Sequence, residues 1–157
     1  MTKALIFSDS HKQFLPMMKA IEKEGRVDYI IHAGDVHSDV LDLMALYPKT
    51  PVISVKGNND FWLPDVPDER FFQLEKVKIF LTHGHMFGVK YSLANLYKKA
   101  DSLGADICIF GHTHISHNEN TGNITLFNPG AASTSYGVLE IDDTDFNIKV
   151  LKGGDLK

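Results

Sequence analysis

The sequence lacks cysteine pairs, long hydrophobic runs and an excess of positive charge, and each absence excludes a class of protein. With one cysteine among 157 residues, an internal disulfide cannot form, and nothing indicates an oxidising compartment. No stretch approaches the roughly 20 apolar residues of a membrane span. The apolar run at residues 4–7 is too short for a secretory signal peptide. We therefore expect a cytoplasmic protein.

The net charge of −4 argues against a protein that binds the backbone of nucleic acids, because such proteins normally carry a basic face. It does not exclude a nucleotide substrate, because bound cations can supply the positive charge. A content of 43% hydrophobic and 23% charged residues is typical of a globular protein, and the length suits one domain over residues 1–157. Cys108 lies in an apolar run and is expected to be a buried strand thiol.

The first 60 residues alternate apolar runs with amphipathic segments. The predicted elements are, in order, a strand at 4–7, a helix at 16–24, a strand at 28–31, a helix at 38–47 and a strand at 52–55. Ser38 or Asp39 is expected to cap the second helix, whose apolar stripe includes Leu41 and Met44. This β-α-β-α-β order implies right-handed crossovers and a parallel sheet.

The second half of the chain follows a different pattern. Its predicted elements are a hairpin at 70–74 and 77–82, a helix at 93–103, and strands at 107–110, 124–127, 136–141 and 146–151. His117 falls between them and is expected on the surface. The sequence therefore predicts a mixed α/β protein in which two sheets pack together and helices lie outside.

Polar residues with metal-binding side chains recur directly after five of the predicted strands. The segments are Asp9-Ser10-His11, Gly34-Asp35, Gly57-Asn58-Asn59-Asp60, His83-Gly84-His85 and Gly111-His112-Thr113-His114. In open α/β sheets, ligands bind at the carboxyl ends of strands, because the loops there converge on one crevice. We therefore expect Asp, Asn and His side chains from all five segments at one rim.

The types of these side chains are those that bind divalent metals. Carboxylates, an amide oxygen and imidazoles suit cations such as Mn²⁺, Fe²⁺ and Zn²⁺, whereas the lack of thiolate ligands argues against a closed structural zinc site. In an extended segment, the members of the pairs Asp9/His11 and His112/His114 would point the same way. Each motif alone is weak, since an isolated Asp or His is usually a solvated loop residue or a helix cap. The ordered set of five predicts a metal site.

This ordered set resembles the calcineurin-like metallophosphoesterase superfamily and, within it, the small YfcE-like phosphodiesterases. Two further segments, Phe127-Asn128-Pro129-Gly130 and Ser135-Tyr136-Gly137, are similar to the same small family. The resemblance covers nearly the whole chain. It implies an α/β fold, a four-layer α/β/β/α sandwich of two mixed β-sheets flanked by helices.

The resemblance also implies an activity and a set of ligands. In the family, the first metal ion is held by the residues that match Asp9, His11, Asp35 and His114. The second is held by those that match Asp35, Asn58, His83 and His112, so that Asp35 bridges the two ions. We therefore expect a metal-dependent phosphodiesterase that hydrolyses a phosphate ester with a hydroxide bridging two divalent metals. Mn²⁺ is the expected ion, with Fe, Zn and Ni as alternatives.

Three other residues are candidate catalytic groups. Many relatives carry histidine between the positions of Asn58 and Asp60, where this chain has Asn59. A carboxamide can donate a hydrogen bond, but it cannot act as a general acid near neutral pH. Asp60 would then have no imidazole to orient. His85, two residues after His83, could contact the substrate or support a metal ligand.

Two alternatives remain open. The chain could be a phosphomonoesterase or a nuclease of the same superfamily, or a protein-binding scaffold like the retromer subunit that shares this fold. A scaffold should have lost several metal ligands, whereas this chain keeps all seven. We expect a small phosphoester substrate, no membrane partner, and nucleic acid only as a substrate, and we leave a homo-oligomer open.

Overall fold

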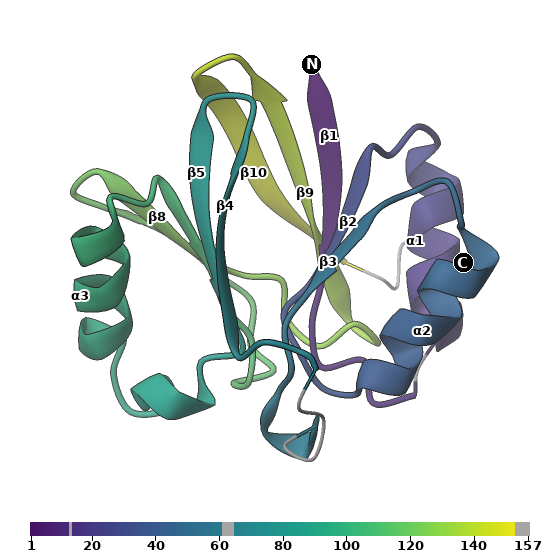
Figure 1. Cartoon of the computed structure of the whole chain (residues 1–157), viewed down its shortest axis with the longest axis horizontal. Coiled ribbons are helices and arrows are strands. Elements are labelled where there is room, and N and C mark those ends of the chain that lie inside the picture. The colour runs from purple at the N-terminus through teal and green to yellow at the C-terminus, as the bar shows by residue number, and fades with distance from the viewer. Residues whose placement is uncertain (13, 61–64, 153–157) are drawn as a thin grey trace.

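Two five-stranded β-sheets face each other at the centre of the molecule, and helices cover both outer faces (Figure 1). The computed structural model describes residues 1–12, 14–60 and 65–152. In spatial order, the first sheet contains β10 (Asp145–Lys152), β9 (Ser135–Asp142), β1 (Thr2–Phe7), β2 (Tyr29–His32) and β3 (Val52–Ser54). The second contains β4 (Glu69–Leu74), β5 (Val77–Thr82), β6 (Ile107–Ile109), β8 (Ile124–Asn128) and β7 (His117–Thr121).

The helices of the described residues are α1 (Phe14–Glu24), α2 (His37–Leu46), α3 (Ala94–Leu103) and the short 3₁₀ helices η1 (Asn58–Asp60) and η2 (His85–Phe87). Figure 1 shows α1 and α2 against the first sheet and α3 against the second. Separate apolar cores fill the space between the two sheets, between the first sheet and α1 and α2, and between the second sheet and α3. The predicted four-layer α/β/β/α sandwich is confirmed.

Strand β1 shows why a central strand has an unbroken apolar sequence. Ala4 and Ile6 face the core between the sheets, whereas Leu5 and Phe7 face the core beneath α1 and α2. All four side chains are fully buried, and each of the larger ones stabilises the fold by about 1.5–3 kcal/mol. Both faces of a strand in a middle layer must therefore be apolar. Cys108 on β6 is buried in the same way beneath α3, as predicted, and burial raises the pKa of its thiol.

The strands that precede the predicted site run in the same direction within each sheet. In the first sheet, β2 is parallel to both β1 and β3. In the second, β6 is parallel to both β5 and β8. The carboxyl ends of β1 and β5 lie at the end of the molecule opposite the N-terminus in Figure 1. The loops that follow these strands therefore come together at one end of the sandwich.

Two details of the predicted helix α2 are wrong. It has no side-chain cap, and Ser38 and Asp39 lie within its first turn. Leu41 and Met44 are 54% and 42% exposed and do not form its buried face. The physical reason is that Asp39 points into the protein, where its carboxylate accepts a hydrogen bond from Ser10 Oγ at 2.6 Å. A buried polar contact, which periodicity does not reveal, sets the rotation of this helix.

Strand β7 is an element that sequence analysis missed. Its residues, His117–Thr121, are all polar and mostly exposed, and it forms one edge of the second sheet by pairing antiparallel with β8. An edge strand that buries little apolar surface does not need alternating hydrophobic residues. Polar side chains on such a strand also discourage pairing of its free backbone edge with another chain. His117, expected on the surface, is half-buried at the first position of this strand.

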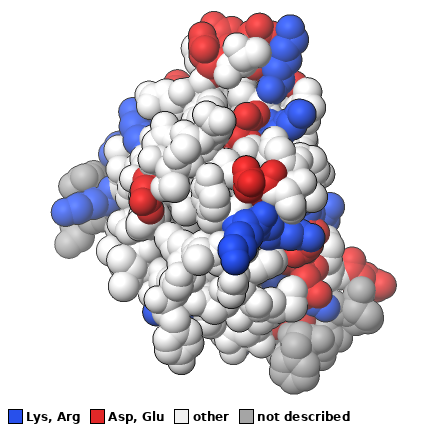
Figure 2. Space-filling view, turned by 90° about the vertical axis from the view of Figure 1, so that its left-hand side faces the viewer, with Lys and Arg blue, Asp and Glu red and all other residues white. Residues whose placement is uncertain are grey.

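The outer surface carries charges of both signs. Figure 2 shows acidic and basic side chains interspersed over the face that includes α3, so this face has no single-sign field for a nucleic-acid backbone. In the described residues, no helix combines the length and the hydropathy that crossing a bilayer requires.

Candidate metal centre

Hydrogen bonds join the loops at the carboxyl ends of the strands. Asp9, after β1, donates its backbone N–H to Gly34 O at 2.9 Å and so connects two loops of the first sheet. Gly111, after β6, donates to His83 O at 3.0 Å and connects two loops of the second sheet. The His112 N–H donates to Asp9 Oδ2 at 3.0 Å and connects the two sheets. The predicted rim therefore exists.

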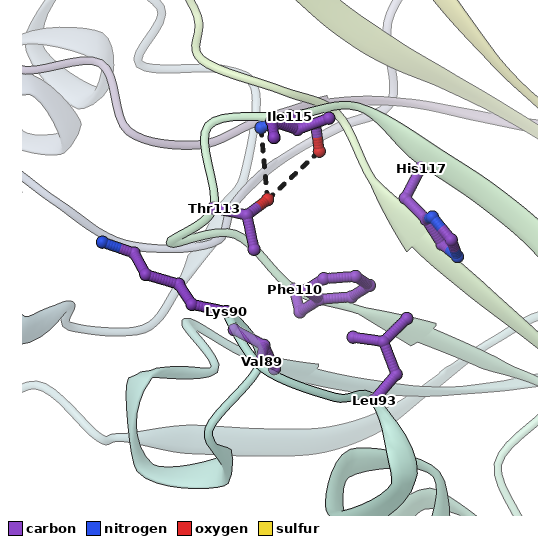
Figure 3. Close-up of a pocket in the computed structure, with 7 residues that line it drawn as sticks. All are labelled: Val89, Lys90, Leu93, Phe110, Thr113, Ile115 and His117. Carbon is purple, nitrogen blue, oxygen red and sulfur yellow. Dashed lines mark hydrogen bonds between the residues drawn. The ribbon is translucent and has the colours of Figure 1, made fainter.

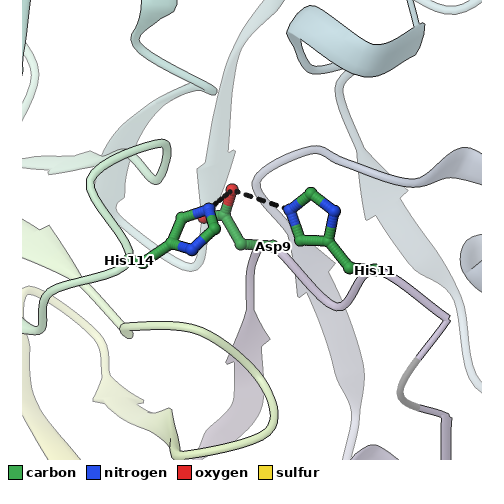
Figure 4. Close-up of side chains that lie close together, drawn as sticks. All are labelled: Asp9, His11 and His114. Carbon is green, nitrogen blue, oxygen red and sulfur yellow. Dashed lines mark ion pairs between the residues drawn. The ribbon is translucent and has the colours of Figure 1, made fainter.

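The Asp9 carboxylate lies at the centre of this rim. Its Oδ2 accepts hydrogen bonds from Ser8 Oγ at 2.6 Å and from a backbone N–H, whereas its buried Oδ1 has no hydrogen-bond partner. Three imidazole Nε2 atoms face Oδ1, those of His114 at 3.3 Å, His83 at 3.7 Å and His11 at 3.9 Å. Figure 4 shows Asp9 between the rings of His11 and His114. A cation would satisfy this buried, unpaired oxygen.

Asp35 is a second carboxylate that faces histidines from both sheets. Its Oδ2 lies 3.4 Å from His83 Nε2 and 3.8 Å from His11 Nε2. Asn59 binds it from the other side, donating its N–H to Oδ1 at 2.9 Å and its Nδ2 to Oδ2 at 2.8 Å. Burial opposes ionisation of Asp35, but the hydrogen bond and charge of His83, together with Asn59, outweigh burial and hold its pKa well below the usual range.

The predicted ligands form two overlapping groups. One contains Asp9, His11 and His114, and the other contains Asp9, Asp35 and His83. Within each group the ligand atoms all lie within 4.8 Å of one another. Asp9 belongs to both groups, and Asp35 also faces His11 of the first, so both carboxylates lie between the two groups.

Asn58 and His112, the remaining predicted ligands, lie beside His83. Asn58 Oδ1 is 3.0 Å from His83 Nε2, and the ring centroid of His112 is 5.1 Å from that of His83. Burial, followed by the charge of His83, lowers the pKa of His112 to about 4, so this ring is neutral at pH 7. His83 is different: burial lowers its pKa, but Asp35 and Asp9 outweigh burial and raise it above the ordinary value.

A divalent cation fits this donor set. Zinc-like ions bind imidazole nitrogen and carboxylate oxygen at about 2.0–2.2 Å, which leaves neighbouring ligand atoms roughly 3–4 Å apart. His83 Nδ1 lies 2.8 Å from Ala33 O, so that this nitrogen donates to the backbone and Nε2 is left for a cation. Among the described residues, the buried side-chain polar atoms without a hydrogen-bond partner are Asp9 Oδ1, His11 Nε2, His37 Nδ1 and His85 Nδ1. Asp9 and His11 belong to the loop after β1, and His37 and His85 are the first residues of α2 and η2, which follow the loops after β2 and β5.

The backbone at five predicted ligands adopts the left-handed conformation. The φ angle is 53° at Asp9, 44° at His11, 51° at Asp35, 71° at His112 and 63° at His114. Non-glycine residues seldom adopt such angles, although Asp and His do so more often than most. Strain of this kind is on the order of 1–3 kcal/mol per residue and is concentrated at functional sites, where the surrounding structure enforces it. The strained loop backbone therefore directs these side chains toward the site and lowers the stability of the fold.

Two glycines allow the loops to approach the carboxylates. A Cβ atom at Gly57 would collide with the carboxylate of Asp35, and one at Gly111 would collide with Ser8 Oγ and Asp9 Oδ2. Any side chain at these positions would therefore displace a predicted ligand. This close approach is the role expected of glycines next to the ligands.

Asp60, a predicted catalytic group, connects the loop after β2 with the loop after β3 through hydrogen bonds. Its side chain is buried, and its Oδ2 accepts the backbone N–H groups of Asp35 at 3.2 Å and Gly57 at 2.9 Å. Its Oδ1 accepts the His37 N–H at 2.9 Å. Both oxygens are thus engaged with the backbone, and this geometry favours a positioning role over contact with a substrate.

His85, the other predicted group outside the ligand set, lies next to the ligands. Its ring centroid is 5.5 Å from that of His83 and 6.1 Å from that of His112. Its Nδ1 is buried without a hydrogen-bond partner, and burial, followed by the charge of His83, lowers its pKa. A neutral imidazole therefore stands beside the site with a nitrogen available to a ligand.

A buried chain of hydrogen bonds, not found from the sequence, supports the first two loops. Gly34 N–H donates to His32 Nδ1 at 3.1 Å, which leaves His32 Nε2 to donate to Ser10 Oγ at 3.0 Å. Asp39 Oδ2 then accepts both Ser10 Oγ at 2.6 Å and the Lys12 N–H at 2.7 Å. The side chains of His32, Ser10 and Asp39 are all buried. The chain fixes the backbone on either side of the predicted ligands of these loops.

Asn128 supports the loop that follows β6. Its Nδ2 donates to Gly111 O at 3.1 Å and to Thr113 Oγ1 at 3.0 Å, and its Oδ1 accepts the Gly130 N–H at 2.8 Å. The side chain is fully buried. The segment that resembles the small phosphodiesterases thus holds the histidine loop in place.

Comparison with known proteins agrees with this geometry. Residues 2–144 match the Calcineurin-like phosphoesterase superfamily domain. The chain is 36% identical over 148 residues to the probable metallophosphoesterase YsnB of Bacillus subtilis. This alignment covers 88% of this chain and 84% of that protein. It is also 36% identical over 105 residues to phosphodiesterase YfcE of Escherichia coli K12, covering 58% of this chain and 53% of that protein.

Solved structures share the fold. A conserved Streptococcus pneumoniae protein, described as a predicted phosphoesterase, has a TM-score of 0.79 and 30% identity, with 98% of this chain and 90% of that chain covered. Vps29 of Entamoeba histolytica in complex with zinc has a TM-score of 0.75 over 97% of this chain and 99% of that chain. At 20% identity, the second likeness shows the fold alone. The family match and the relatives above 30% identity show that this chain belongs to the calcineurin-like phosphoesterase superfamily.

Proposed function

We propose that this protein is a phosphodiesterase that works with two divalent metal ions. The observation that carries the proposal is the pair of buried carboxylate oxygens, Asp9 Oδ1 and Asp35 Oδ2, each of which faces imidazole nitrogens from both sheets. Membership of the superfamily supports metal-dependent hydrolysis of a phosphoester. The relative named as a phosphodiesterase supports the diester class.

The proposed ligand sets are those that the family resemblance implies, and they overlap with the two groups of side chains without matching them: Asp9 belongs to both groups, and Asn58 and His112 to neither. The first ion would be held by Asp9, His11, Asp35 and His114, and the second by Asp35, Asn58, His83 and His112. When bound, such ions generate hydroxide from water near neutral pH and neutralise charge on the phosphoryl oxygens. Carboxylate and imidazole ligands suit Mn²⁺, our first choice, and Fe, Zn and Ni bind the same types of ligand.

The protein's own groups prepare the site for this chemistry. Asn59 orients the Asp35 carboxylate through two hydrogen bonds and, after His83, helps to lower its pKa. The hydrogen bond from His83 to Ala33 O fixes the ring so that Nε2 faces the carboxylates. His112 is neutral at pH 7 and can bind a cation without losing a proton, whereas the raised pKa of His83 means that this ring must lose one.

The alternatives differ from the proposal in measurable ways. A phosphomonoesterase or a nuclease would use the same ligands on another substrate, and a protein-binding scaffold would hydrolyse none. No observation on the described residues favours any of them over the diester. The histidines and carboxylates of the site are all present, which argues against the scaffold.

A substrate screen with metal analysis tests the proposal. Protein reconstituted with Mn²⁺ is assayed on bis-p-nitrophenyl phosphate, p-nitrophenyl phosphate and linear DNA, and the metal content of the same sample is measured. We expect the diester to be hydrolysed with a higher kcat/KM than the monoester or DNA. A preference for the monoester or DNA would identify the corresponding alternative, and no hydrolysis by fully loaded protein would favour the scaffold.

A further inference from the structure

A cavity of about 450 Å³ opens against the loop that carries the predicted ligands His112 and His114, of which Figure 3 shows Thr113. One wall comes from the segment between β5 and α3, and the other from the loop after β6 and the start of β7. This volume falls within the roughly 300–1,000 Å³ of small-molecule sites. None of the residues predicted from the sequence to be metal ligands or catalytic groups lines it.

Thr113 connects the cavity to the metal centre. It stands between the predicted ligands His112 and His114 in the sequence, and its own side chain lines the cavity. Its Oγ1 already accepts hydrogen bonds from Asn128 Nδ2 at 3.0 Å and the Ile115 N–H at 3.1 Å. Figure 3 shows the hydroxyl turned to Ile115 and the methyl group turned toward Phe110. Thr113 therefore presents a methyl group to the cavity.

The inner surface of the cavity suits a flat aromatic group. Phe110 is buried at its base, with its ring centroid 6.2 Å from that of His117 and the two planes tilted by 58°. Val89 and Leu93 add aliphatic surface on the other side. Aromatic rings stack and pack on such surfaces.

One cation stands at the edge of the cavity. Lys90 is exposed and lines it, and Figure 3 shows its amine extending away from the Phe110 ring. Lys90 lines the same cavity as Thr113, the residue between the predicted ligands His112 and His114. A cation at the edge of a partly apolar cavity complements an anion that carries an apolar group.

We propose that this cavity binds an aromatic group on one ester arm of the phosphodiester, with Lys90 beside the phosphoryl oxygens. The inference rests on the proposed function, because it requires a phosphoester at the metal centre. The arm can be a simple aryl group or a nucleobase, and both present the same flat ring. Selection among diesters would then depend on Phe110, Leu93 and His117 and not on the metals.

Paired inhibitors measure this selection. Phenylphosphonate and methylphosphonate carry the same anionic head, and both compete with bis-p-nitrophenyl phosphate for the Mn²⁺-loaded enzyme. We expect phenylphosphonate to bind at least about tenfold more tightly, because burying several ring carbons is favourable. Adenosine 5′-phosphate and ribose 5-phosphate form a second pair, which distinguishes a nucleobase from a smaller ring.

Three variants assign the preference to the cavity. Leu93→Asn removes apolar surface and should keep the fold, because Leu93 occupies the N-cap of α3 without a side-chain bond and Asn is a good N-cap. His117→Ala removes the half-buried ring. Both should reduce the aromatic preference severalfold. Lys90→Gln should weaken both phosphonates alike, and Lys149→Gln, which changes an exposed lysine on β10, is the matched control and should change neither.

A binding measurement separates this inference from the proposed function. In Zn²⁺-loaded protein, NMR signals of the Phe110 and His117 rings should shift with phenylphosphonate and not with methylphosphonate. Equal affinity within both inhibitor pairs, or a preference that persists in both cavity variants, would overturn the inference even if diesters are hydrolysed normally. Absence of phosphoester hydrolysis would instead overturn the proposed function, and the ring signals would still decide on the cavity.

Discussion

Asn59 binds the Asp35 carboxylate with both of its hydrogen-bond donors, the backbone N–H at 2.9 Å from Oδ1 and Nδ2 at 2.8 Å from Oδ2. The family resemblance implies histidine at the position of Asn59, and the Asn59 side chain is exposed. The carboxylate that it holds is buried and faces His83 and His11. The departure from the family pattern therefore has a structural consequence: a carboxamide orients a predicted metal ligand.

Replacing Asn59 by alanine should weaken metal binding. Asn59→Ala removes the Nδ2 bond to Asp35 and keeps the backbone bond, so the carboxylate loses part of its support. The loss of a group that orients a ligand typically costs about 10–100-fold in metal affinity. Isothermal titration with Mn²⁺ measures it, with Asn147→Ala, an exposed position on β10, as the control. Unchanged affinity would show that Asp35 does not need Asn59.

Replacing Asn59 by histidine should change leaving-group selectivity. An imidazole can donate a proton to a departing alkoxide, and such general acid catalysis typically raises the rate about 10²–10⁴-fold. A p-nitrophenolate leaving group hardly needs this proton. We expect Asn59→His to raise turnover of unactivated diesters relative to bis-p-nitrophenyl phosphate, at matched metal loading and across pH. Equal effects on both substrates, or none, would mean that Asn59 only positions Asp35. His85 would then be the next candidate for the proton donor.

The layers of the fold could be predicted because strands in the middle layers bury both faces and therefore form unbroken apolar runs, as β1 does. Two features of the fold have no corresponding apolar pattern in the sequence. Strand β7 covers no core and is entirely polar, and the rotation of α2 depends on the contact between Asp39 and Ser10. Both depend on tertiary neighbours, which hydrophobic periodicity does not encode.

The candidate ligands could be predicted because each follows a recognisable strand and has a metal-binding side chain. The hydrogen-bonded residues that hold these ligands in place could not be predicted. His32, Ser10 and Asp39 come from three separate segments, and each alone is an ordinary polar residue. The sequence also gives no sign that Asp9 Oδ1 is unpaired, because that depends on how the loops close around it.

Metal binding should weaken as the pH falls, and His83 should set the range. Burial lowers the pKa of His83, but Asp35 and Asp9 outweigh burial and raise this pKa above the ordinary value of about 6.5. A cation must displace this proton, so affinity is lost as the pH falls through the raised pKa. Titration with Mn²⁺ in buffers of different ionisation enthalpy should detect proton release near pH 7. A pH-independent affinity from pH 8 to 6 would contradict this account.

The stability of the metal-free protein should also depend on His32. Burial, followed by the charge of His83, lowers the pKa of His32 to about 4. Between about 6.5 and 4 the unfolded chain takes up this proton and the folded protein does not, so this group lowers the free energy of unfolding as the pH falls, by on the order of 3 kcal/mol. His83, with a raised pKa, acts in the opposite direction.

An NMR titration isolates the contribution of His32. Its ring signal should remain that of a neutral imidazole down to about pH 4, and urea unfolding at the same pH values should show the loss of stability. A His32 signal that titrates near 6.5 would show that its hydrogen bonds to Ser10 and Gly34 tolerate a charged ring.

The number of metal ions bound per chain tests the central claim most directly. Protein saturated with Mn²⁺ and freed of excess metal is analysed for its elements, alongside Asp35→Asn and the exposed control Asp145→Asn. We predict about two equivalents for the wild type and for Asp145→Asn, and a clear loss for Asp35→Asn, because Asp35 faces histidines of both groups. One equivalent or none in the saturated wild type, or two in Asp35→Asn, would contradict a two-metal site built around Asp35.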